Sequence, residues 1–207
     1  FQPQLTQSYA KGNHERTEEL MLNMTKISYI LFCIISIPII VEVKYLLNLW
    51  LGNVIPDYTE PFVFLTVVIM GLGLFHTSIT QTFLATGKLK SFQIITSLII
   101  CAILPISWFL LKNGTSPTSV YIVTLIVYFV NWVVCLFLLH GTFKFSVKRY
   151  VRMVGECLIL TSIALALSFV LHSTIQVPIL RILSILCIEL IVMVFLMSRL
   201  GITRIRK

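Results

Sequence analysis

The sequence predicts an all-α membrane protein, a polytopic bundle of six transmembrane helices whose N- and C-termini are both cytoplasmic. Three observations support this prediction. Only 12% of the 207 residues are charged and the mean hydropathy is +0.96, whereas about a quarter of the residues of a soluble domain are charged. Six apolar stretches are each long enough for one bilayer crossing, which takes about 20 residues. Lysine and arginine are also distributed unevenly between the segments that join these stretches.

Residues 1–23 are expected to form a cytoplasmic juxtamembrane helix, and residues 24–207 a single transmembrane helical domain. Gly12 and Asn13 can cap a helix that starts near His14, and the carboxylate of Glu15 suits the positive end of its first turn. We expect this helix to continue into the first span. Because the chain begins at Phe1 rather than at methionine, we also expect it to be part of a longer protein.

The breaks between apolar stretches place the six spans. Segments rich in turn residues, such as GNVIPDYTEP and KNGTSPTS, separate the stretches. Pro38 and Pro105 lie inside the first and third spans, and each lacks a backbone donor, so we expect both helices to bend. The spans are expected at about residues 27–48, 61–85, 91–111, 119–140, 153–172 and 178–199.

The positive charges predict which way the spans run. With the N-terminus placed inside, only Lys44, Lys112 and Arg181 fall on the outer side, which leaves thirteen of the sixteen lysines and arginines inside. Cytoplasmic loops carry such an excess of positive charge. The net charge of +8 therefore indicates cytoplasmic loops that attract anionic lipid headgroups. No aromatic-interleaved basic groove of the kind that binds nucleic acid is present.

The sequence does not predict an enzyme or a cofactor. Catalytic motifs such as GxSxG, a Walker loop or HExxH are absent, and the single aspartate is Asp57. The five cysteines lie in apolar runs without a CxxC motif, which favours small buried apolar residues over metal ligands or disulfides. They are Cys33, Cys101, Cys135, Cys157 and Cys187.

Polar side chains gather on one quarter of the second span. His76 and Thr80 share this stripe with small and hydroxyl residues, and Gln81 lies at its edge. Such a face is expected to meet another helix or water rather than lipid. His76 is a candidate for a coupling or substrate-binding residue, and a packing role is the alternative. The stripe also contains Thr66, Gly73 and Thr77.

Two lysines define a second pattern, on the first span. Lys26 and Lys44 are 18 residues apart, or five helical turns, and are expected to share one face near the two helix ends. A groove with a cation at each end would suit an anionic headgroup. The favoured alternative is that both side chains reach toward the interfaces on either side of the membrane.

Glu189 is expected near the middle of the last span, where a carboxylate is costly. No basic residue lies one turn away, so Glu189 either is neutral or has a partner on another helix. Proton coupling and a hydrogen-bonded packing role both remain open for it. Asn131 is expected to form a hydrogen bond between helices.

The fifth span carries a row of small and polar residues that predicts a packing seam with another helix. Near its inner end, the spacing of Arg152 and Glu156 predicts a local ion pair. The seam comprises Thr161, Ala164, Ser168 and His172.

Three segments together resemble the Wzx-type O-antigen flippases of the multidrug/oligosaccharidyl-lipid/polysaccharide exporter superfamily. The first is PQLTQSYAKGNHERTEEL at 3–20, where Asn13 stands in place of the more common aspartate. The second combines LLNLWLG at 46–52 with QTFLATGKLK at 81–90, and the third is LPISWFLLKNGTSPTSVYIV at 104–123. The resemblance covers about residues 1–150.

This resemblance implies a carrier with two helical lobes around a central cavity, of which the chain would supply spans nine to fourteen. The rest of the same chain would then include the N-terminal lobe. The implied substrate is an undecaprenyl-pyrophosphate-linked oligosaccharide, which moves across the bacterial inner membrane through a polar, wet cavity. Glu189 would lie on a peripheral helix of such a carrier. The alternatives are another exporter of the superfamily, for drugs or a peptidoglycan precursor, and a membrane enzyme of envelope polysaccharide synthesis.

Overall fold

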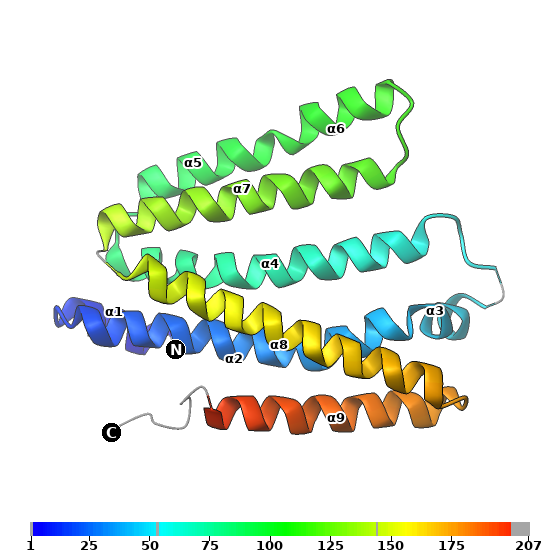
Figure 1. The fold of residues 1–207 in the computed structure, drawn as a ribbon. Coiled ribbons are helices and arrows are strands. Elements are labelled where there is room, and N and C mark those ends of the chain that lie inside the picture. Colours follow the sequence, from blue (N-terminus) through cyan, green and yellow to red (C-terminus); the bar gives the residue numbers. More distant parts are fainter. Residues whose placement is uncertain (1, 53, 144, 200–207) are drawn as a thin grey trace.

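The computed structural model describes residues 2–52, 54–143 and 145–199, which form helices and no strands (Figure 1). Long helices lie side by side, with α5, α6 and α7 at one edge of the bundle and α9 at the other. The helices are α1 (Gln2–Ala10), α2 (His14–Val41), α3 (Val43–Leu51), α4 (Thr59–Thr86), α5 (Leu89–Cys101), α6 (Ile103–Lys112), α7 (Thr118–Thr142), α8 (Val147–Thr174) and α9 (Pro178–Arg199).

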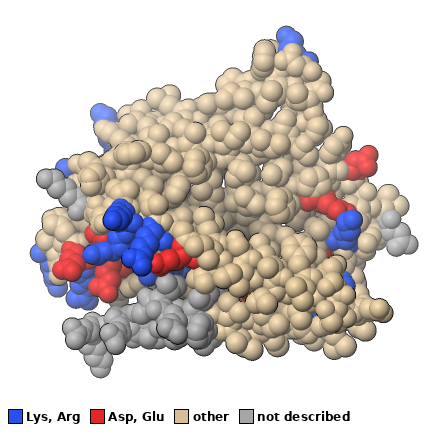
Figure 2. All heavy atoms as spheres, viewed as in Figure 1, with Lys and Arg blue, Asp and Glu red and all other residues tan. Residues whose placement is uncertain are grey.

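Five helical segments are long and apolar enough to cross a membrane: α2, α4, α5 together with α6, α7 and α8. They fit a membrane helix bundle. Figure 2 shows lysine, arginine, aspartate and glutamate side chains gathered toward the ends of one face, with a wide uncharged zone between them. The sixth expected span coincides with α9, and its crossing stays a prediction, as does the side of the membrane on which each end lies.

The start of α2 agrees with the prediction from Gly12 and Asn13. The side chain of Asn13 accepts a hydrogen bond from the backbone N–H of Arg16 at 3.0 Å, and α2 begins at His14. Residues 2–23 do not form one helix, however. Gly12 has φ 69°, which turns the chain between α1 and α2, and this left-handed conformation is one that glycine adopts without steric cost.

Both spans that contain a proline are interrupted. In place of a continuous helix over 27–48, α2 ends at Val41 and α3 begins at Val43 in a new direction (Figure 1). In place of 91–111, the chain breaks at Ala102 between α5 and α6. Pro105 cannot donate to the carbonyl of Cys101, which explains the second break. The first break falls four residues after Pro38, at Glu42.

The centre of the bundle is where α2 packs on α4 and α8, and α4 packs on α7. Tyr150 of α8 is fully buried, and its hydroxyl donates to the backbone carbonyl of Phe75 in α4 at 2.8 Å. At the same end of α8, Glu18 of α2 accepts from the backbone N–H of Ser146 at 3.2 Å and lies 3.2 Å from Arg149. The start of α8 is therefore held to both α2 and α4.

Replacing Tyr150 by phenylalanine removes only the hydroxyl that joins α8 to α4. We expect a loss of about 1 kcal/mol in the free energy of unfolding, the usual net contribution of one such hydrogen bond. Denaturation of the purified protein in detergent measures this loss. The matched control is Tyr58→Phe, because Tyr58 is exposed and its change is expected to stay within about 0.5 kcal/mol. Equal effects of the two substitutions would show that the Tyr150 bond is not formed.

Candidate functional site

A cavity of about 580 Å³ lies between α2, α4, α7 and α8. Its floor is formed by α2 and α4. Ile126 and Phe129 of α7 and Leu158 of α8 line its edge and are about half-exposed, so the cavity opens at the surface of the bundle. Figure 2 shows this face hollowed in the uncharged zone. A molecule that enters here therefore comes from the level of the apolar belt rather than from the charged ends.

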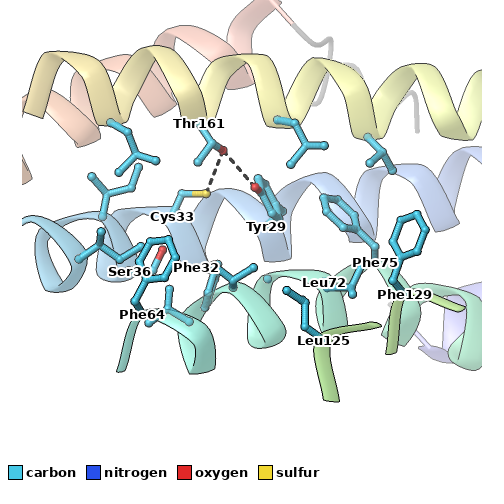
Figure 3. Close-up of a pocket in the computed structure, with 18 of the residues that line it drawn as sticks. Tyr29, Phe32, Cys33, Ser36, Phe64, Leu72, Phe75, Leu125, Phe129 and Thr161 are labelled. Carbon is cyan, nitrogen blue, oxygen red and sulfur yellow. Dashed lines mark hydrogen bonds between the residues drawn. The ribbon is translucent and has the colours of Figure 1, made fainter. Parts of the chain in front are cut away.

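Three of the polar groups in the wall of this cavity contact one another (Figure 3). The hydroxyl of Thr161 lies 3.1 Å from the hydroxyl of Tyr29 and 3.5 Å from the thiol of Cys33. The ring of Tyr29 stacks on Phe75 with 4.7 Å between centroids. The remaining wall is mostly aliphatic and aromatic. Such a lining favours a hydrocarbon guest over a sugar, because a sugar needs free hydrogen-bonding groups.

This cavity differs from the polar cavity that the resemblance implies. None of the seven predicted site residues lines it. The polar groups of Tyr29, Cys33 and Thr161 are paired with one another across α2 and α8, and the buried N–H of Trp132 has no partner among the described residues. A polar route for the sugar stays a prediction.

Three of the predicted residues come together between α4 and α7. The Nε2 atom of His76 lies 3.1 Å from Nδ2 of Asn131 and 3.5 Å from Sγ of Cys135. The Nδ1 atom of His76 lies 3.4 Å from the hydroxyl of Thr80. Asn131 is buried, so the prediction that it bonds between helices is confirmed. This cluster makes His76 a packing residue at the α4–α7 interface, and a transport role for it stays a prediction.

The predicted polar stripe is not the most buried face of α4. The buried side chains of that helix include Phe75, Ser78 and Thr82, whereas Thr77 in the stripe is exposed. The hydroxyl of Thr77 donates to the carbonyl of Gly73 in its own helix at 2.8 Å. A hydroxyl that is satisfied in this way can lie on the surface of a helix without a partner on another helix.

The two lysines do not share one helix. Lys26 lies half-buried on α2, and Lys44 lies on α3 beyond the break at Glu42. The five-turn register that predicted a common face therefore does not apply. Lys44 is 76% exposed and lies 3.8 Å from Glu60 at the start of α4. This exposed position fits the alternative in which the side chain reaches toward the interface.

Gln81 and Glu189 each have a buried oxygen with no hydrogen-bond partner among the described residues. Glu189 is fully buried, and its Oε1 atom accepts from the hydroxyl of Ser168 at 3.1 Å. Of the two alternatives expected from the sequence, a neutral carboxyl or a partner on another helix, the structure shows an uncharged hydrogen-bond partner on α8. The row that contains Ser168 also contacts α2 through Thr161 and the α2–α3 corner through His172, so the predicted packing seam is confirmed.

A cluster that the sequence analysis did not predict lies at the break between α2 and α3. The carboxylate of Glu42 is buried and forms an ion pair with the guanidinium of Arg181 in α9. Its Oε1 atom also lies 2.8 Å from Nδ1 of His172 at the end of α8. The only signal in the sequence was that all three residues fall near the outer ends of their spans. The cluster fixes the α2–α3 corner to both α8 and α9.

The cysteines and acidic residues form no metal site in the described part of the chain, where no group of three or more His, Cys, Asp or Glu side chains could hold an ion. All five cysteines are free. Three are buried as predicted, at 33, 135 and 157, whereas Cys101 and Cys187 are exposed. The predicted pair of Arg152 and Glu156 is confirmed at 3.0 Å.

Comparisons of the chain with protein-family models, with curated proteins and with solved structures found no match. The class to which the protein belongs is therefore taken from its fold alone. The chain is all-helical in its described residues, and five helical segments suited to crossing a bilayer make it a multi-pass membrane protein.

Removal of the Arg181 side chain leaves the buried carboxylate of Glu42 with His172 as its one remaining side-chain partner among the described residues. We expect Arg181→Ala to lower the free energy of unfolding by about 3–5 kcal/mol, since breaking a buried ion pair strands a charge. Unfolding in detergent provides the measurement. Lys44→Ala is the matched control because its pair with Glu60 is exposed, and such pairs contribute about 1 kcal/mol or less. A loss no larger than that of the control would contradict the buried pair.

Proposed function

We propose that this chain is part of a carrier, not an enzyme, that flips an undecaprenyl-pyrophosphate-linked oligosaccharide across the bacterial inner membrane for surface polysaccharide synthesis. The observation that carries the proposal is the apolar cavity between α2, α4, α7 and α8 and its opening within the uncharged zone. The resemblance of residues 1–150 to polysaccharide flippases supports the choice of substrate.

The cavity is suited to the hydrocarbon chain of a lipid. At this depth the surrounding solvent is acyl chains, so the cavity fills from the side with an apolar guest. Its volume lies within the range of ligand sites in proteins, about 300–1,000 Å³. A prenyl chain held here would keep the attached pyrophosphate near one face of the bundle, where it can enter a polar route.

An exporter of apolar drugs is the second candidate, because the same cavity also fits an apolar drug. The two functions differ in what accumulates when the protein is lost. Loss of a flippase leaves lipid-linked repeat units on the inner leaflet and reduces surface polysaccharide. Loss of a drug exporter leaves surface polysaccharide unchanged and alters drug tolerance.

The test is complementation of a strain in which the full gene is deleted, followed by extraction of lipid-linked repeat units. Wild-type protein should clear the accumulated intermediate. Leu72→Trp fills the cavity from α4, and displacing two methylene groups of a bound chain costs about 1.6 kcal/mol. We therefore expect this variant to be slower by more than about tenfold at limiting substrate.

The control is Leu98→Trp, which makes the same change at an exposed position on α5 and should clear the intermediate at the wild-type rate. Both variants must be present in the membrane at wild-type levels. Equal rates for the two variants would remove the cavity from the mechanism. Deletion without any accumulation of lipid-linked repeat units would refute the function itself.

A further inference from the structure

Glu189 is a carboxyl group enclosed by three helices. It is fully buried on α9, which packs against α2 and α8. The Oε1 atom accepts one hydrogen bond from Ser168 of α8, and the Oε2 atom is buried with no partner among the described residues. An ionised carboxylate in such surroundings needs a compensating positive charge.

The described residues provide no such charge. From α8 the group in contact with the carboxyl is the hydroxyl of Ser168. On α2 the buried thiol of Cys33 lies 3.5 Å from the hydroxyl of Thr161, and neither group carries a positive charge. Of the basic side chains on these helices, Arg181 of α9 already pairs with Glu42, and His172 of α8 lies 2.8 Å from the same carboxylate. Lys26 of α2 is half-buried and lies seven residues before Cys33, about 10 Å along the helix axis. Arg181 is also eight residues before Glu189, about 12 Å along the helix axis.

A bound metal cation is a poorer fit than a proton. Hard cations such as calcium require a shell of six or more oxygen ligands. Among the described side chains, the carboxyl has hydrogen-bond contact with one other oxygen, that of Ser168. A single proton on Oε2 is enough to neutralise the group, and it needs no additional ligand.

We propose that Glu189 is a proton-binding site within the bundle. Oε2 takes a proton from water when α9 packs against α2 and α8, and returns it to water when this interface opens. Proton binding therefore stabilises the packing of α9 against α2 and α8. The neutral carboxyl still accepts the hydrogen bond from Ser168, and no unpaired charge is left in the bundle. This binding does not depend on the proposed transport function.

The test is infrared spectroscopy of the purified full-length protein at neutral pH. A protonated carboxyl has a C=O stretching band that a carboxylate lacks, so the wild type should show this band. Glu189→Gln should remove it. The matched control is Glu60→Gln, which changes a partly exposed carboxylate paired with Lys44 and should leave the band intact. A wild type without the band, or a band that persists in Glu189→Gln, would overturn the proposal.

A second variant keeps the proposal testable if Glu189→Gln does not fold. Ser168→Ala leaves the carboxyl in place and removes the hydrogen bond to its Oε1 atom. The band should then remain at equal intensity and move to higher frequency, because its C=O accepts one bond fewer. An unshifted band would show that the bond from Ser168 is not made, and would count against the site.

The infrared readout separates this site from the proposed function. A protein that shows the Glu189 band but moves no lipid-linked oligosaccharide retains the proton site and loses the function. A protein that flips this lipid without showing the band retains the function and loses the site.

Discussion

A polar group inside a membrane has no water to bond with, so it must be satisfied by its own helix or by a neighbouring helix. Many polar side chains of the described structure follow this constraint, although buried atoms of Gln81, Trp132 and Glu189 have no partner among the described residues. Thr77 bonds to its own backbone, Asn131 meets His76 across the α4–α7 interface, and Ser168 meets Glu189 across the α8–α9 interface. Each bond between helices fixes which helix packs on which, so the arrangement of the bundle depends on a small number of polar pairs.

The cavity follows from this arrangement. The row of residues on α8 bonds to α2 and α9, while α7 packs on α4, α5 and α6. Beyond Tyr150, which bonds to α4, the bonds of α8 go to α2 and α9 rather than to α7, and a space between α7 and α8 stays open above α2 and α4. Glu42 joins the corner between α2 and α3 to α8 and α9, through His172 and Arg181. A mostly apolar hollow is the result.

The parts of this structure that the sequence predicted depend on local spacing. The cap at Asn13, the pair of Arg152 and Glu156, and the seam on α8 each follow from residues within a few turns of one helix. The pair of Glu42 and Arg181 joins residues 139 positions apart, and no local pattern reports such a contact. The cavity was not predicted either, because it depends on how α7 and α8 diverge in space. The prediction that Lys26 and Lys44 share one face was wrong. It assumed an unbroken helix over five turns, and the helix breaks between them at Glu42.

The central claim is that the cavity holds the hydrocarbon chain of the transported lipid. A photoreactive amino acid at position 129, on the rim of the cavity, tests it most directly when the full-length protein is irradiated in membranes that contain the lipid-linked oligosaccharide. We expect a covalent adduct that carries the oligosaccharide at position 129, and none at the exposed position 98. Equal labelling at the two positions, or adducts with bulk phospholipid alone at position 129, would contradict the account.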